Sequence, residues 1–142
     1  MKQKITFILG VLFLAACNNT PIKEVIKESY PNNQAKLIEF VQEVDGKEQV
    51  VEQKAYFEDG QFKMGGKLLE GKRNGKWSAY FSNGKLQSEG EFENGMRTGI
   101  AKIYYENGNL MYDGQYKNDQ KIGVWKFYNE KGEFVKEEKF KE

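Results

Sequence analysis

The chain has 142 residues, about one domain's worth, with 22 basic and 21 acidic residues, no histidine and a single cysteine. This balance of charge argues against a nucleic-acid-binding protein, which carries a basic excess, and against a polybasic surface for acidic lipid. The missing histidine and second cysteine exclude metal sites built on those ligands, no Asp-x-Asp-x-Asp-Gly calcium loop is present, and we expect neither metal nor cofactor.

Residues 1–16 have the pattern of a secretory signal peptide. Lys2 and Lys4 come before a mostly apolar run over 5–14, which is too short to cross a bilayer because crossing takes about 20 apolar residues. The following Leu14-Ala15-Ala16-Cys17 resembles the lipobox of bacterial lipoproteins, in which the cysteine is lipidated and becomes the mature N-terminus. The resemblance implies a membrane anchor at Cys17. The alternative is an ordinary signal peptide with a cysteine near its cleavage site.

The lone cysteine agrees with lipidation, since an exported chain with one cysteine has no intramolecular disulfide to form. Acyl chains on one residue anchor a protein to a membrane without spanning it. Removal of residues 1–16 leaves 20 of the 22 basic residues against 21 acidic ones, a net charge near −1. We expect an exported lipoprotein of the cell envelope, held in the outer membrane if the cell has one.

Residues 17–36 are expected to join the anchor to the folded domain. Ile22, Val25 and Ile26 lie at helical spacing behind a Thr-Pro pair, so one prediction is a short helix. Isolated helices of fewer than about 12 residues are marginal in water, and the preferred prediction is a flexible tether. A coil of about 19 residues would hold the domain on the order of 25 Å from the bilayer.

Residues 37–142 are predicted to form a β-repeat domain, because apolar and polar residues alternate with period two and three stretches superimpose at a shift of 24 residues. A fixed period of this length marks a repeat architecture. The recurring positions are the glycines Gly66, Gly90 and Gly114, then Gly75, Gly99 and Gly123, then Gly84, Gly108 and Gly132, and the tyrosines Tyr80, Tyr104 and Tyr128, with Tyr56 in a degenerate first unit.

Each unit is predicted to be a β-hairpin. Residues 76–82 and 85–92 are strand-like and flank Asn83-Gly84, a strong sequence signature of a two-residue hairpin turn. The fold class is therefore all-β, an antiparallel meander of consecutive hairpins with about 3.5 repeats. The last residues, 136–142, are expected to form a charged edge strand, which protects a sheet against edge-to-edge aggregation.

The two-residue turn sets a register that sorts side chains into two faces. On the apolar face Trp77 lies opposite Gly90, where its indole is expected to cover the bare glycine. Gly75, Gly99 and Gly123 are expected in the turns between hairpins. Pairs predicted from this register include the apolar Phe81·Leu86 and, on the other face with the tyrosines, the opposite charges Lys76·Glu91, Lys102·Asp113 and Lys126·Glu137.

The repeating residues match a known pattern over about residues 55–140. They include Gly90-Glu91-Phe92-Glu93-Asn94-Gly95, Gly99, Tyr104-Tyr105, Gly108 and Leu110, then Gly114-Gln115-Tyr116, Gly123, Trp125, Tyr128 and Gly132. These units resemble the MORN repeat, and more closely the bacterial variant of the YwqK-type toxin–antitoxin antitoxin family. The resemblance implies a ribbon of hairpins with a binding or scaffolding role, and the antitoxin family implies neutralisation of a partner protein.

Two residues depart from the repeat pattern. Asp119 stands where Gly95 stands one unit earlier, and Ala101 stands where Trp77 and Trp125 stand in the neighbouring units. We expect these departures to loosen one turn and one packing site without disturbing the spacing.

Catalysis is not expected. Glu89, Asp113 and Glu137 recur in order, but each is predicted on an exposed strand position opposite serine or lysine. Solvated charge pairing is therefore preferred over a glycosidase-type pair of acids, because catalytic carboxylates need burial to shift their pKa.

The candidate binding residues are aromatic and basic side chains on the charged face. The tyrosines would lie two strands apart, about 9.6 Å, and such a ladder suits a peptide, a protein or an envelope polymer. The alternative is that each tyrosine only covers its neighbours in a thin sheet. The sequence predicts a non-catalytic, membrane-anchored binding scaffold, or alternatively an immunity-type lipoprotein that neutralises a toxin. The candidate residues are Tyr56, Tyr80, Tyr104, Tyr128, Lys102 and Lys126.

Overall fold

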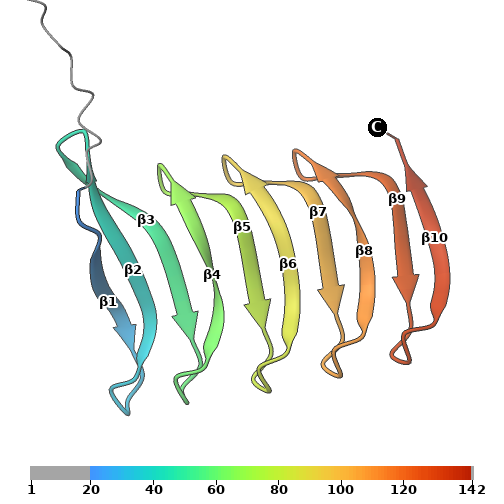
Figure 1. Ribbon diagram of the computed structural model, residues 1–142, viewed down its shortest axis with the longest axis horizontal. Coiled ribbons are helices and arrows are strands. Elements are labelled where there is room, and N and C mark those ends of the chain that lie inside the picture. The colour runs from blue at the N-terminus through green and yellow to red at the C-terminus, as the bar shows by residue number, and fades with distance from the viewer. Residues whose placement is uncertain (1–19, 142) are drawn as a thin grey trace, which may run out of the picture.

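The computed structural model describes residues 20–141, which form one antiparallel sheet (Figure 1). Ten strands follow one another in chain order, each hydrogen-bonded to the next. The predicted all-β meander is confirmed. No helix within residues 20–141 is long and apolar enough to cross a membrane. The strands are β1 (Lys23–Ser29), β2 (Ala35–Val44), β3 (Lys47–Tyr56), β4 (Phe62–Leu69), β5 (Lys72–Tyr80), β6 (Leu86–Glu93), β7 (Met96–Tyr104), β8 (Leu110–Lys117), β9 (Gln120–Tyr128) and β10 (Phe134–Phe140).

The sheet begins before residue 37, so the helix and the tether expected over this segment are both wrong for residues 23–29. β1 pairs antiparallel with β2 and places Ile26 opposite Ile38. β-branched residues favour a strand once a partner strand is available, which overrides the weak helical spacing. A shift of 24 residues does not detect the β1–β2 hairpin, because its turn residue Asn33 lies 27 positions before Gly60, the equivalent residue of the next turn. Cys17 and the signal peptide predicted over 1–16 lie outside the described residues.

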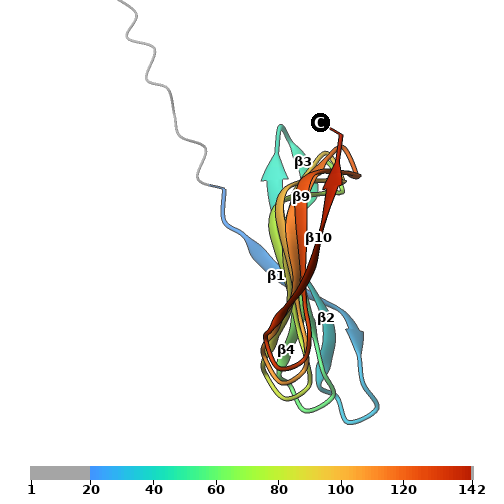
Figure 2. The same ribbon diagram turned by 90° about the vertical axis from the view of Figure 1, so that its right-hand side faces the viewer.

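The sheet is a single layer, seen edge-on as a thin twisted ribbon in Figure 2. Domains usually bury an apolar face of a sheet against a second layer of structure. In residues 20–141 the buried hydrophobic side chains are only Ile38, Trp77 and Trp125. Both faces of the sheet are therefore open to solvent.

Five turns share one geometry at the end of the sheet that is lower in Figure 1. In β5–β6 the Phe81 N–H donates to the Lys85 carbonyl and the Gly84 N–H donates to the Phe81 carbonyl, each at 2.9 Å. The loop therefore has three residues, Ser82–Gly84, and the predicted two-residue turn is wrong. The Asn83 side chain explains the difference, because its Oδ1 accepts the Lys85 N–H at 3.0 Å and stabilises this wider turn.

The wider turn changes the register only beside the loop. Leu86 pairs with Tyr80, and not with Phe81 as expected, because a bulge at this end absorbs one residue. From Ala79 to Lys76 the pairs are as predicted, including Trp77 opposite Gly90.

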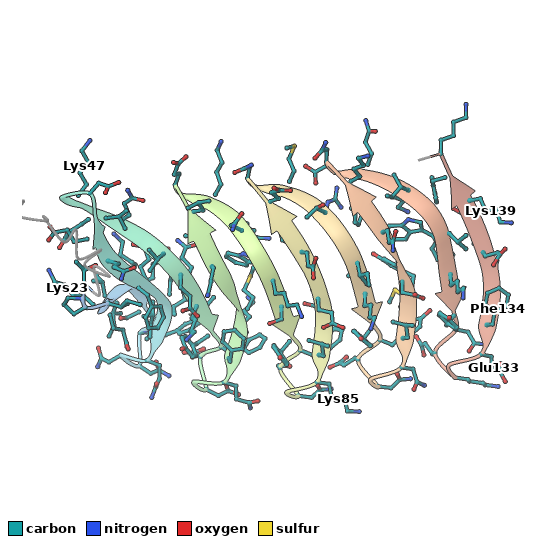
Figure 3. The ribbon with its side chains drawn as sticks, turned by 45° about the horizontal axis from the view of Figure 1, so that its top comes forward. Lys23, Lys47, Lys85, Glu133, Phe134 and Lys139 are labelled. Carbon is teal, nitrogen blue, oxygen red and sulfur yellow. The ribbon has the colours of Figure 1, made fainter. Side chains whose placement is uncertain are left out.

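The four turns at the other end are two-residue turns whose central residues both have positive φ, as a type I′ turn requires. They are Asp45-Gly46, Glu70-Gly71, Asn94-Gly95 and Asn118-Asp119. In Figure 3, Lys47 and Lys85 mark the two rows of turns, at opposite ends of the strands, and Phe134 and Lys139 lie on the last strand. β10 is an edge strand, as predicted for the charged C-terminal residues.

Gly75, Gly99 and Gly123 lie inside β5, β7 and β9, which corrects their expected placement in turns. Their φ angles are 73°, 62° and 65°. Each lies where the register to the preceding strand shifts, so a positive φ is needed for a bulge within the strand.

Candidate functional site

The four candidate tyrosines lie at one level of the sheet, on what we call the Tyr face. Tyr56, Tyr80, Tyr104 and Tyr128 are the last residues of their strands and are half-buried. The rings of Tyr56 and Tyr80 lie 5.9 and 5.5 Å from that of Phe62. Part of the ring surface of Tyr56 and of Tyr80 is therefore in contact with Phe62 and is not available to a ligand. The cross-strand partners of the four are Phe62, Leu86, Leu110 and Phe134.

Lys102 and Lys126 lie on the same face, on either side of Asp113, so the predicted register of Lys102·Asp113 is confirmed. The ion pair of Lys102, however, is with Glu89 at 3.7 Å, and the Tyr104 hydroxyl donates to the same Glu89 oxygen at 3.1 Å. Burial and this hydrogen bond raise the pKa of Tyr104. The Oδ1 atom of Asp113 is buried and accepts no hydrogen bond within residues 20–141.

A shallow hollow of about 380 Å³ lies on the Tyr face between β5, β6 and β7. Its lining includes two of the predicted residues, Tyr80 and Lys102. Charges of both signs, from Lys76 and Lys102 and from Glu89 and Glu91, also line it. These charges balance one another.

The opposite surface, which we call the Trp face, carries clusters of a cation, an indole and a second aromatic ring. The Arg73 guanidinium lies 4.2 Å from the centre of the Trp77 ring and 5.4 Å from that of Phe92. The two rings meet edge to face, 6.4 Å apart at 69°. Cation–π and aromatic contacts of this kind stabilise each other's placement.

The Trp77 ring covers Gly66 on the preceding strand, and not Gly90 as expected. A Cβ added at Gly66 would lie 2.6 Å from the ring. The Trp77 Nε1–H donates to the Lys67 carbonyl at 2.9 Å, and Lys67 lies in the bulge between Gly66 and Leu68. The bulge frees that carbonyl from the strand ladder, and the hydrogen bond draws the indole toward Gly66.

The same cluster recurs two repeats later. Lys121 Nζ lies 4.4 Å from the centre of the Trp125 ring, and Trp125 meets Phe140 at 6.3 Å and 76°. The Trp125 Nε1–H donates to the Gln115 carbonyl at 3.2 Å, and its ring lies where a Cβ at Gly114 would be. Both tryptophans therefore sit on the glycine of the strand before them.

The middle repeat lacks its indole. Ala101 stands at this position, and the nearest atom to a Cβ built on Gly90 is the Ala101 Cβ at 3.9 Å. A hollow of about 160 Å³ opens here, close to the size, about 150 Å³, of an apolar cavity that binds benzene. Its walls include Trp77, Phe92, Ile103, Tyr112 and Tyr116, with Arg73 and Arg97 at the rim. The one acidic residue of the lining, Glu89, is paired with Lys102.

Arg97 is the cation of the middle repeat. With no indole beneath it, the guanidinium lies 4.2 Å from the centre of the Tyr116 ring and its Nε–H donates to Asp119 Oδ1 at 2.8 Å. The Arg97 backbone N–H donates to the same oxygen at 3.1 Å. This hydrogen bonding lowers the pKa of Asp119 and raises that of Arg97.

Asp119 therefore ties its turn to β7, which corrects the expectation that it would loosen the turn. Its backbone has φ 66°, a conformation that Asp tolerates better than most residues. Its N–H donates to the Arg97 carbonyl at 3.0 Å, as the Gly95 N–H does to the Arg73 carbonyl at 2.9 Å. The side chain adds bonds that glycine cannot make.

A family model described as the MORN repeat variant matches residues 73–94 and 97–118. These two stretches of the chain are therefore similar to MORN-variant repeats. A comparison with curated protein sequences finds no significant match. The first MORN-variant match contains one wall of the hollow, with Arg73, Trp77 and Phe92, and the second contains the other wall, with Arg97 and Tyr116.

The residues around the hollow were not among the predicted site residues. A sequence signature for them exists, since Arg73, Arg97 and Lys121 recur at 24 residues, as do Phe92, Tyr116 and Phe140. Together with the exceptional Ala101, this recurrence marks an interrupted repeat unit. Within residues 20–141 no group of three acidic or cysteine side chains is placed to hold a metal ion.

Proposed function

We propose that this protein is a non-catalytic scaffold that binds a partner protein on the Trp face, and that a lipid on Cys17 holds it at a membrane. The observation that carries the proposal is the interrupted cluster at Ala101. An aromatic-walled hollow with two guanidinium groups is left open on a surface that no second layer within residues 20–141 covers. Aromatic and arginine side chains are the residues that dominate the cores of protein interfaces.

Two carboxylates of the sheet, Asp119 and Glu138, are unsuited to act as general acids. A general acid at neutral pH needs a raised pKa, usually from burial. The Arg97 hydrogen bond lowers the pKa of Asp119, and the Lys136 hydrogen bond lowers that of Glu138. Both groups are thereby held more firmly as charged acceptors.

The Trp face is a better candidate than the Tyr face because its charges are less balanced. The hollow on the Tyr face is larger, but Lys102 there is already paired with Glu89. Arg73, on the Trp face, takes part in none of the ion pairs found within residues 20–141. A partner on the Trp face would therefore meet an uncompensated positive charge.

The start of the sheet supports a close attachment to the membrane. The Thr20 hydroxyl donates to the Glu43 carbonyl at 2.8 Å, and the Gln42 amide donates to the Thr20 carbonyl at 2.9 Å. Three residues of chain reach at most about 10 Å. A lipid on Cys17 would thus hold the β2–β3 end of the sheet near the bilayer, with no long tether between them.

Photo-crosslinking in the protein's own cells tests the binding role. A benzophenone amino acid at position 103 projects from the Trp face, and one at position 102 projects from the Tyr face. We expect a discrete protein adduct from position 103 and little from position 102. Adducts from position 102 alone, or none from either, would overturn the proposal.

The anchor has a separate test. In a Cys17→Ser variant we expect the protein to leave the membrane fraction, because the acyl chains have no other attachment residue. A variant that stays in the membrane fraction would contradict the anchor while leaving the binding face untouched.

A further inference from the structure

We propose that the hollow over Gly90 receives one aromatic side chain of the partner protein, with a carboxylate next to that ring in the partner. This inference rests on the proposed function, because it names what the Trp face recognises. The hollow has the place and the lining of a missing indole, and its rim is cationic. The neighbouring clusters have the indole of Trp77 or Trp125 in this place, with an aromatic lining and a cation, Arg73 or Lys121, at the rim.

The bare glycine is the first argument. Gly66 and Gly114 have no room for a Cβ because the Trp77 and Trp125 rings lie on them. Gly90 keeps the glycine although no ring within residues 20–141 covers it, and a Cβ there would meet only the Ala101 Cβ at 3.9 Å. A ring from outside can therefore approach the Gly90 backbone as closely as the two tryptophans approach theirs.

The walls of the hollow are already fixed. On one side the Nε1–H bond to Lys67 holds Trp77, which is 7% exposed. On the other side Tyr116 packs edge to face on the buried Trp125 at 4.9 Å, and Tyr112 lies 5.8 Å from the same ring. A site whose walls need no rearrangement binds with a smaller loss of conformational entropy.

The rim determines the charge of the occupant. Arg73 stacks on Trp77 and Phe92 and has no carboxylate partner within residues 20–141, while Arg97 is paired with Asp119. A planar guanidinium suits a carboxylate through two parallel hydrogen bonds. A carboxylate beside the partner's aromatic ring would supply the acceptor that Arg73 lacks.

Titration with two probes, indole-3-acetate and indole, tests this assignment. The amide resonances of Gly90 and Ala101 and the indole N–H of Trp77 report binding in a ¹H–¹⁵N spectrum of the full chain. We expect both probes to shift these resonances, and indole-3-acetate to bind severalfold more tightly than indole. Shifts spread over the whole sheet, or none at these residues, would overturn the site.

Three variants sharpen the test. Ala101→Trp fills the hollow as the neighbouring repeats do, and we expect it to abolish binding of both probes. Arg73→Gln, at an exposed side chain, should weaken binding of indole-3-acetate by a larger factor than binding of indole, so that the two probes bind about equally. Lys121→Gln removes the matching cation from the filled cluster and should change neither. Equal binding of indole-3-acetate to the wild type and to Arg73→Gln would overturn the role of the carboxylate.

The outcomes separate this inference from the proposed function. If crosslinks form from position 103 while neither probe binds, the partner uses the Trp face without the hollow, and only the inference fails. If the probes bind but no crosslink forms, the proposed function fails. If the wild type self-associates and Ala101→Trp abolishes this, the hollow binds a second copy of the chain. That result would overturn the assignment to a separate partner protein.

Discussion

The Trp77 ring lies against Gly66 of the preceding strand, so close that a Cβ on Gly66 would be 2.6 Å from the ring atoms Cγ and Cδ1. Gly90, one repeat later, has the same place in the sheet but meets only the Ala101 Cβ at 3.9 Å. Neither glycine has a positive φ, and they differ in what a Cβ would meet, since at Gly66 it would also lie 2.7 Å from the Lys76 carbonyl oxygen. They form a matched pair for mutation.

Gly66→Ala should destabilise the protein, because the added methyl group clashes with the Trp77 ring and with the Lys76 carbonyl oxygen. Overpacking of this kind costs about 1–3 kcal/mol. Gly90→Ala should change the free energy of unfolding by no more than about 0.5 kcal/mol, since the methyl group enters the open hollow. Urea denaturation of both variants measures the difference. Equal losses would show that the ring does not distinguish the two positions.

Replacing Asp59 by asparagine should stabilise the turn between β3 and β4. In the equivalent turns, the Asn83 and Asn107 amides donate to the carbonyls of Glu106 and Glu130 in the next turn. Asp59 accepts the Gln61 N–H in the same way, and its second oxygen accepts the Gln61 side-chain amide at 2.9 Å, but it has no N–H to donate to the next turn. We expect Asp59→Asn to raise the free energy of unfolding by about 0.5 kcal/mol, the low end for one hydrogen bond at an exposed site.

The reverse change is the control for this turn. Asn83→Asp keeps the acceptor within the turn and removes only the donor to the next turn, so it should lower the free energy of unfolding by a similar amount. If the free energy of unfolding changes in the same direction in both variants, hydrogen bonding between successive turns does not stabilise the protein as expected.

The Asp119–Arg97 contact should give a pH-dependent part of the stability. Arg97 holds the pKa of Asp119 below its ordinary value of 3.8. A carboxyl group whose pKa is lower in the folded state contributes its full stability above the unfolded pKa, and that contribution is lost as pH falls through the folded pKa. The advantage in melting temperature of the wild type over Asp119→Asn should therefore shrink between neutral pH and about pH 2. A constant difference over this range would contradict the contact.

Much of the fold follows from local residues. The 24-residue recurrence of glycine and tyrosine and the strand-like runs between turns specify a meander, and the register of Trp77 with Gly90 follows from their spacing. The β1 strand escaped prediction because it is stabilised by pairing with β2 and not by a strong local pattern. The turn at Asn83-Gly84 was misjudged because the side-chain bond of Asn83 decides between two turn types that the same dipeptide allows.

The site was less accessible to prediction than the fold. A strand pairs with two neighbours, so the register alone does not say whether Trp77 covers Gly66 or Gly90. The choice depends on the Lys67 carbonyl that a bulge frees for the Nε1–H. Once the indole is known to lie on the preceding strand, Ala101 predicts an opening over Gly90 between Arg73 and Arg97.

Filling that opening should stabilise the protein. Ala101→Trp would bury a large apolar side chain on Gly90, as Trp77 and Trp125 are buried on their glycines. Burial of a large apolar side chain contributes about 1.5–3 kcal/mol. We expect a higher urea midpoint than that of the wild type, and a lower one would show that the hollow is not shaped for an indole.

The same substitution tests the central claim most directly, through the yield of protein adduct from the crosslinker at position 103. If the hollow is where the partner binds, the adduct obtained with the wild-type background should be lost in the Ala101→Trp background, although that variant is the more stable protein. An adduct of the same size and yield in both backgrounds would contradict the claim.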